Sequence, residues 1–270
     1  MTRPRLGLAL GCGSARGWSH IGVIRGLAEL GLEPDVVAGA SVGSLVAAAH
    51  ASGRLEALED WVRALTQREV WRLVDTRFRG GGVMTGNRLM DEIARHVGDP
   101  LIEELALGFA AVATDLHTGE EVWIREGPVM TAVRASSGLP GLFTPTWYLE
   151  RWLIDGGVVN PLPVSVCRAL GADVVIAVDL GRPVGEGDVQ EHRRTQPTLL
   201  DSMANAVSIM QDAITRSRLV IEPADLVLRP DVNHFQLMDF HRAAEAIEIG
   251  HKHVHEYAAR VAPIRARFLR

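Results

Sequence analysis

The segment Asp35-Val36-Val37-Ala38-Gly39-Ala40-Ser41-Val42-Gly43 decides how this chain is expected to fold. Its first five residues contain the apolar run Val36-Val37-Ala38 and predict a buried strand. The strand ends sharply at Gly39, and the apolar run over 45–49 predicts a helix directly after the turn. The last five residues fit the pattern G-x-S-x-G, in which small neighbours allow a serine to occupy a strained strand-to-helix turn. Such a turn exposes the Ser41 hydroxyl and directs a helix N-terminus toward negative charge that develops beside it.

The same five residues have a simpler explanation, a glycine-rich bend that carries a serine without a chemical role. The predicted strand before Ser41 and the predicted helix after it favour a nucleophile over this alternative, because that context is what the pattern requires.

A second glycine loop, Gly11-Cys12-Gly13-Ser14-Ala15-Arg16-Gly17, lies between a strand expected over 6–10 and a helix expected over 21–30. A glycine loop at a helix N-terminus presents backbone N–H groups to an anion, either a phosphate or the oxyanion of a tetrahedral intermediate. Its spacing, G-x-G-x-x-x-G, departs from the dinucleotide fingerprint G-x-G-x-x-G, and no acidic residue ends the strand over 35–39. The P-loop pattern is also missing from the sequence. A nucleotide-dependent oxidoreductase is therefore the weaker hypothesis.

A third motif, Asp155-Gly156-Gly157, follows a strand expected over 152–154. An aspartate at a strand end can orient or deprotonate a hydroxyl, although an isolated D-G-G more often only caps its own turn. Nine histidines follow Ser41 as alternative bases: His50, His96, His117, His192, His234, His241, His251, His253 and His255. The four from 241 to 255 share one helical segment and are expected to be structural or solvated. The Ser–Asp–His order of α/β-hydrolases also needs several strands before the nucleophile, whereas Ser41 follows only the second.

The rest of the chain continues the alternation of strands and helices, which predicts an α/β fold with a parallel sheet. Further helices are expected over 55–73, 89–97, 129–135, 161–170, 199–219 and 240–261. Further strands are expected over 109–114, 121–124, 152–154, 173–179 and near 226, with loops over 77–86, 136–141 and 181–197. Because neither a repeat nor a linker interrupts this order, we expect one domain over 1–270.

The composition of the chain indicates a globular protein and argues against a nucleic-acid binder. Hydrophobic residues make up 47% of the chain and charged residues 23%, which is typical of a globular protein. The net charge of −5 argues against a nucleic-acid binder.

Cys12 and Cys167 cannot form a disulfide framework, and no group of carboxylates and histidines at metal spacing is evident, so we expect neither metal nor cofactor. The apolar run over 6–10 is too short for a signal peptide and 36–53 is too polar to span a membrane, so a cytoplasmic location is expected.

The three motifs in this order resemble the patatin-like phospholipases. Two smaller matches agree, Ala113-Thr114-Asp115-Leu116 before Thr118-Gly119, and Ala135-Ser136-Ser137-Gly138-Leu139-Pro140-Gly141 with Phe143. The stretch over 10–23 is similar to small bacterial, RssA-like members. The resemblance covers roughly residues 6 to 180. It implies a three-layer α/β/α fold with a mainly parallel sheet, on which C-terminal helices over 199–262 pack.

The resemblance also implies a mechanism. Ser41 would be the nucleophile and Asp155 its base, without a histidine or a cofactor. The residues assigned to the oxyanion hole are Gly11, Cys12, Gly13, Ser14, Arg16 and Gly17. The glycines assigned to the nucleophile turn and to the D-G-G motif are Gly39, Gly43, Gly156 and Gly157. The implied substrates are lipid or lysolipid esters, met by transient contact with a membrane surface and with no nucleic acid involved.

Three points stay open at the level of sequence. Most family members carry three glycines before x-Arg-Gly, whereas Cys12, Gly13 and Ser14 stand here, which bears on substrate range. A regulatory or interaction protein that retains the hydrolase scaffold is the alternative function, although the presence of both Ser41 and Asp155 favours an enzyme. The segment 55–86 is either a mobile lid or a set of ordinary packed helices, and its apolar candidates for lipid contact are Trp61, Trp71, Phe78 and Val83.

Overall fold

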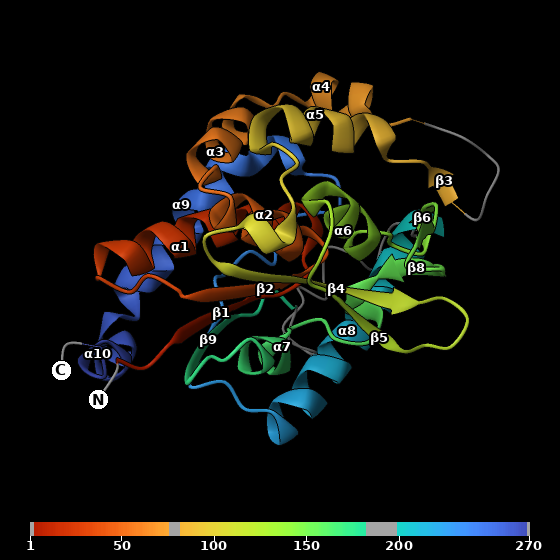
Figure 1. Ribbon diagram of the computed structural model, residues 1–270. Helices are drawn as coiled ribbons and strands as arrows, with labels where there is room; N and C mark the ends of the chain where they lie inside the picture. Colours follow the sequence, from red (N-terminus) through yellow and green to blue (C-terminus); the bar gives the residue numbers. More distant parts are fainter. Residues whose placement is uncertain (1–2, 76–81, 182–198, 269–270) are drawn as a thin grey trace.

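A mixed sheet of eight strands runs through the computed structural model, which describes residues 3–75, 82–181 and 199–268 (Figure 1). The strand order is β10-β9-β1-β2-β4-β8-β7, with β5 also paired to β4. Their bounds are β1 Leu6–Leu10, β2 Val36–Ala40, β4 Gly108–Asp115, β5 Glu121–Ile124, β7 Thr146–Tyr148, β8 Arg151–Asp155, β9 Val174–Val178 and β10 Leu226–Leu228. The five strands from β10 to β4 are parallel, whereas β5 and β8 run antiparallel to β4, and β7 antiparallel to β8.

Helices cover both faces of this sheet, which confirms the predicted three-layer α/β/α architecture (Figure 1). Side chains alternate along each strand, so Leu8 joins the core on one face while its neighbour Ala9 joins the core on the other. Parallel strands covered in this way are apolar on both sides, which explains their unbroken hydrophobic runs. The first face carries α1 Ser19–Glu29, α2 Val42–Ala51, α6 Val129–Ser136 and α9 Ala243–Glu256. The second face carries α7 Val164–Ala169 and α8 Leu199–Ile221.

The helices α1 and α9 pack closely because glycines face their contact. A Cβ on Gly22 of α1 would overlap the Ile247 carbonyl oxygen, and a Cβ on Gly250 of α9 would overlap the Ser19 carbonyl oxygen. The two backbones therefore approach more closely than larger residues would allow. This contact joins the C-terminal part of the chain to the first helix.

Two predicted helices are each divided in the structure, and both predictions were wrong in this respect. The stretch 55–73 forms α3 Leu55–Ala64 and α4 Gln67–Leu73, because Thr66 starts a new helix through a capping box with Glu69. The stretch 240–261 forms a short 3-10 turn η4 Phe240–Arg242, then α9, then α10 Ala258–Ala266. Tyr257 leaves helical geometry between the last two.

Several smaller elements differ from the predictions. The expected loop over 77–86 contains a strand, β3 Gly82–Met84, which pairs with β6 Gly141–Phe143 in a second sheet; residues 76–81 lie outside the described part. The strand β7 was not predicted. The helix expected from Pro161 begins only at Val164, and Pro163 is its N-cap residue. The remaining elements are η1 Ser14–Trp18, α5 Asn87–Val97, η2 Ile102–Glu104 and η3 Gly156–Val158.

Within the described ranges, none of the helices is both long and apolar enough to cross a bilayer.

Candidate active site

Ser41 occupies a sharp turn between β2 and α2. Its backbone angles, φ 56° and ψ −131°, lie in a region that L-residues rarely adopt, so the turn is strained. A Cβ on Gly39 would overlap the backbone of Gly43, and a Cβ on Gly43 would overlap the Leu10 carbonyl oxygen. The turn is held by the Ser136 hydroxyl, which accepts a hydrogen bond of 3.0 Å from the Ser41 amide. The G-x-S-x-G spacing is therefore a steric requirement of this turn.

Asp155 lies beside the same turn because of strand pairing. Ala40, the last residue of β2, pairs with Val112 of β4, and Asp155, the last residue of β8, pairs with Ala113, the next residue of β4. Two strands more than a hundred residues apart in sequence thus end at the same level, one on each side of β4. A Cβ on Gly156 would overlap the Val112 carbonyl oxygen, which explains a glycine directly after the aspartate.

The Asp155 carboxylate is almost completely buried, with 1% of the residue exposed. Burial raises its pKa from 3.8 to about 6. Hydrogen bonds from the Ser41 hydroxyl and from the Gly157 amide, the latter 2.8 Å long, oppose this rise in pKa. Above pH 6 the carboxylate is therefore ionised, hydrogen-bonded to the Ser41 hydroxyl, and more basic than an exposed aspartate.

The first glycine loop has two kinds of backbone N–H group. The amides of Gly11 and Cys12 donate to the carbonyls of Val178 and Pro161, each at 3.0 Å, so they hold the loop against the sheet. The amides of Gly13 and Ser14 have no acceptor in the part of the chain that the structure describes. Of the six residues assigned to the oxyanion hole, Gly11 and Cys12 thus cannot donate to an oxyanion in this conformation.

The side chains around this loop set its shape. Ser14 has a positive φ of 51°, and its hydroxyl donates to the Leu237 carbonyl at 2.7 Å. The Arg16 guanidinium donates back to the Gly13 carbonyl through Nε, at 3.2 Å. A Cβ on Gly17 would overlap the Val42 side chain, so a glycine there lets the loop lie against the helix that follows Ser41. Arg16 and Gly17 therefore shape the loop.

His20 is a residue of this region that the sequence reasoning missed. It is completely buried, and its Nε2 lies 2.8 Å from the Gly11 carbonyl oxygen, to which it donates because a carbonyl can only accept. Burial lowers the pKa of His20 to about 4, so the ring is neutral. Unlike the nine histidines named above as alternative bases, His20 precedes Ser41 in the sequence. Within the described residues no histidine hydrogen-bonds to Ser41 or Asp155.

A cavity of about 150 Å³ opens above Ser41 and Asp155. The polar part of its lining includes Ser14 and Arg16, and Gly13 lines it as well. Its walls are mostly apolar and come largely from α3, α4 and α5, with these side chains among others: Trp61, Leu65, Val70, Leu73, Leu89, Met90 and Ile93. The segment proposed as a lid or as packed helices therefore lines the cavity. Trp71 on α4 is 62% exposed, whereas Phe78 and the Val83 side chain lie outside the described residues.

The family model named "Patatin-like phospholipase" matches residues 8–168, a range that contains both glycine loops and Asp155. This chain belongs to the patatin-like phospholipase family. The patatin-like match begins inside β1 and ends inside α7, so it includes the strands that place Ser41 and Asp155 together.

Named relatives share this patatin-like region. An uncharacterized NTE family protein of Mycobacterium bovis is 30% identical over 92% of this chain and 89% of its own length. A lysophospholipase NTE1 of Coccidioides immitis is 30% identical over 95% of this chain but only 18% of its own length. The patatin-like phospholipase domain-containing protein 6 of Mus musculus is 29% identical over 94% of this chain and 20% of its own. The small mycobacterial protein therefore matches in extent, and the two larger proteins contain a corresponding region.

Proposed function

We propose that this protein is a serine hydrolase that cleaves acyl esters of lipids, with lysophospholipids as the main substrate class. One observation carries the proposal: the Ser41 hydroxyl, on a strained turn, hydrogen-bonds to a buried carboxylate of raised pKa at the floor of an apolar cavity. A nucleophile beside a base in a water-poor site is the arrangement that acyl transfer needs. Two relatives support lipid esters as substrates, since one is named a lysophospholipase and the other a patatin-like phospholipase domain-containing protein.

In the proposed reaction, Asp155 accepts the proton of the Ser41 hydroxyl while Oγ attacks the ester carbonyl carbon. The carbonyl oxygen becomes an oxyanion and accepts hydrogen bonds from the Gly13 and Ser14 amides, aided by the N-terminus of α2. Collapse of the intermediate expels the alcohol, which takes the proton from Asp155 and leaves an acyl ester on Ser41. Water then attacks the carbonyl carbon of this ester while Asp155 accepts its proton. As the bond to Ser41 Oγ breaks, Asp155 returns this proton to Oγ, so the fatty acid is released and both residues regain their starting state.

The cavity supports an acyl chain as the group that is bound. Its walls are lined by aliphatic and aromatic side chains, and each methylene buried there contributes about 0.8 kcal/mol. A single chain suits a cavity of about 150 Å³ better than two, which favours lysolipids over diacyl lipids.

A substrate panel tests the proposal. Purified wild type and Ser41→Ala are each given lysophosphatidylcholine, diacyl phosphatidylcholine and 4-nitrophenyl butyrate, and released fatty acid or nitrophenol is measured. We expect hydrolysis by wild type alone, fastest with the lysolipid. A folded wild type that hydrolyses none of the three would instead favour a regulatory protein that retains the scaffold.

The glycine loop yields a prediction that separates backbone from side-chain roles. Gly13→Pro removes an amide donor and fixes φ near −65°, whereas the Gly13 backbone is extended at φ 177°. We expect the rate to fall by at least about 100- to 1000-fold, the effect of losing one oxyanion donor. Ser14→Ala is the matched control, since it keeps the amide and loses only the hydrogen bond to Leu237; its rate should stay within about tenfold. A folded Gly13→Pro protein with a near-normal rate would show that the loop binds something other than the transition state.

We also propose that the β7–β8 hairpin is the membrane contact of the enzyme. Trp147 is 58% exposed, Trp152 43% and Leu149 54%, and the two indole rings pack edge to face at 5.2 Å. Tryptophan favours the interface between lipid and water. The hairpin follows Phe143, which lines the cavity, by only a few residues. An exposed aromatic pair therefore lies close in sequence to a wall of the substrate cavity.

The double variant Trp147→Ala/Trp152→Ala is expected to bind phosphatidylcholine vesicles at least severalfold more weakly than wild type in a sedimentation assay. Its rate with soluble 4-nitrophenyl butyrate should be unchanged, because neither side chain lines the cavity. Trp71→Ala, which removes an equally exposed tryptophan from α4, is the control and should bind vesicles normally. Weakened binding of Trp71→Ala alone would move the membrane contact to α4.

A further inference from the structure

A second cluster of chemically active side chains lies at the contact between α1 and α9. It consists of Glu29, the last residue of α1, with His251 and His255 of α9. Nε2 of His251 lies 3.0 and 2.9 Å from the two carboxylate oxygens of Glu29, and Nε2 of His255 lies 2.9 Å from one of them. One ligand atom from each residue lies within 4.8 Å of the others, and all three side chains are partly exposed.

The donor set is one that binds a transition metal. Two imidazole nitrogens and a carboxylate oxygen are typical ligands of Zn²⁺, at about 2.0–2.2 Å. Residues four apart share one face of a helix, so His251 and His255 point at the same carboxylate. In a tetrahedral site of such bond lengths, ligand atoms stand about 3.3 Å apart. The present nitrogen-to-oxygen separations of 2.9–3.0 Å need only a small opening to admit the ion.

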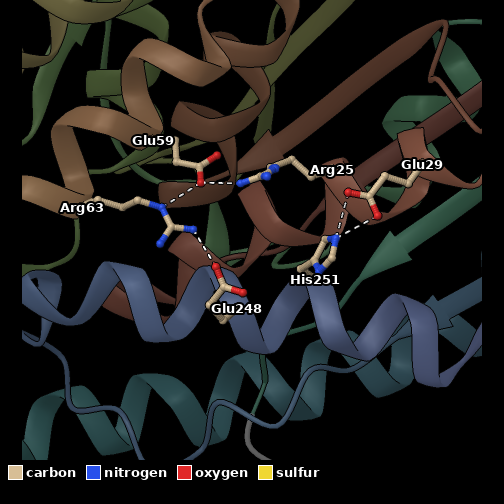
Figure 2. A network of polar contacts seen from close by, with 6 residues as sticks. All are labelled: Arg25, Glu29, Glu59, Arg63, Glu248 and His251. Atoms are coloured by element: carbon tan, nitrogen blue, oxygen red, sulfur yellow. Dashed lines mark hydrogen bonds and ion pairs between the residues drawn. The ribbon is translucent and has the colours of Figure 1, made fainter.

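The surrounding charges leave Glu29 available as a ligand. Arg25, one helical turn before Glu29, donates instead to Glu59 at 2.6 Å (Figure 2). Arg63 donates to Glu59 and to Glu248, at 2.8 Å each. The nearby guanidinium groups are thus paired with other carboxylates. Within the described part of the chain, the hydrogen bonds of Glu29 go to His255 and to His251, and Figure 2 shows the contact with His251.

We propose that Glu29, His251 and His255 form a Zn²⁺ site, with water completing the coordination. The ion joins the end of α1 to α9 and stabilises their contact. Its role is structural, because Glu29 lies at the opposite end of α1 from the glycine loop, about 15 Å away along the helix. The sequence does not indicate this site, because Glu29 stands 222 residues from His251 and only the packing of α1 on α9 brings them together.

Calorimetry on untagged, EDTA-treated protein tests the site, with ZnCl₂ as the probe. We expect saturable binding of one ion and a rise in Tm of several degrees at a hundredfold excess over Kd, with no such effect of MgCl₂. His251→Ala and His255→Ala should each lose this binding. His234→Ala is the matched control, because His234 forms a similar pair with Glu245 at 2.9 Å but has no second histidine there; it should bind Zn²⁺ as wild type does.

Glu29→Gln provides a further variant should either alanine variant fail to fold, and it too should lose the binding. Hydrolysis of 4-nitrophenyl butyrate should be equal with and without EDTA, so the site is tested independently of the proposed enzyme activity. Unchanged Zn²⁺ binding in the folded cluster variants, or no saturable binding by wild type, would overturn the proposal.

Discussion

Replacing Ser41 with alanine is expected to abolish ester hydrolysis, with a loss in kcat that approaches the roughly million-fold effect of removing a serine nucleophile elsewhere. The physical reason is that no other hydroxyl stands both on the strained turn and against Asp155 in the described structure. The rate is measured with 4-nitrophenyl butyrate, and Ser52→Ala, at the C-terminal end of the same helix, is the control with normal activity. Turnover retained by Ser41→Ala would refute the assignment.

A glycine at the same position separates chemistry from stability. Ser41→Gly should be as inactive as Ser41→Ala but should unfold at a higher temperature than the alanine variant. Glycine adopts a φ of 56° without the Cβ clash that costs an L-residue about 1 kcal/mol or more. Equal melting temperatures for the two variants would show that the turn is not strained.

The second large effect is expected from Asp155→Asn, which should lower kcat by about ten-thousandfold. Removing the aspartate of a serine protease triad has an effect of this size. The amide keeps the shape of the carboxylate but cannot accept the Ser41 proton. In wild type, kcat/KM should rise with pH through about 6, where Asp155 loses its proton, and then level off. Asp91→Asn, an exposed change on α5, is the control. A histidine-to-alanine variant that is folded yet as inactive as Asp155→Asn would point to a histidine base.

The same substitution should stabilise the protein at neutral pH. The folded-state pKa of Asp155 is raised, so the stability that its proton contributes is complete below pH 3.8 and is lost as pH rises through about 6. A shift from 3.8 to about 6 corresponds to roughly 3 kcal/mol at full ionisation. The neutral amide avoids this cost, so Asp155→Asn should melt above wild type at pH 8, with the difference shrinking toward pH 4.

The parts of the fold that the sequence predicted are those in which neighbouring residues determine the structure. The run from Asp35 to Gly43 predicts strand, turn and helix because each boundary is local, and the apolar strands mark a parallel sheet. The break between α3 and α4 does have a local signal in the sequence, the capping box of Thr66 and Glu69. We nevertheless predicted one helix, because the amphipathic pattern continues across the break. The helix boundary at Tyr257 has no such local signal.

The site depends more strongly on tertiary structure. Asp155 reaches Ser41 through the pairing of β2 and β8 with consecutive residues of β4, which no spacing in the sequence encodes; the family resemblance, and not the spacing, indicated this residue. Likewise, six residues of the glycine loop were assigned to the oxyanion hole from the sequence. The carbonyls of Val178 and Pro161 accept hydrogen bonds from two of the loop amides, and this decides which amides remain for an oxyanion. Glu29 and its two histidines meet only when α9 packs on α1.

Covalent labelling tests the central claim most directly. Wild type, Ser41→Ala and Asp155→Asn are treated with a fluorophosphonate probe at pH 8, and the adduct is located by mass spectrometry of the digested protein. The proposed mechanism predicts one adduct on Ser41 with parallel loss of esterase activity, no adduct in Ser41→Ala, and much slower labelling of Asp155→Asn. An adduct on another residue, or full hydrolysis by protein whose Ser41 is completely labelled, would contradict it.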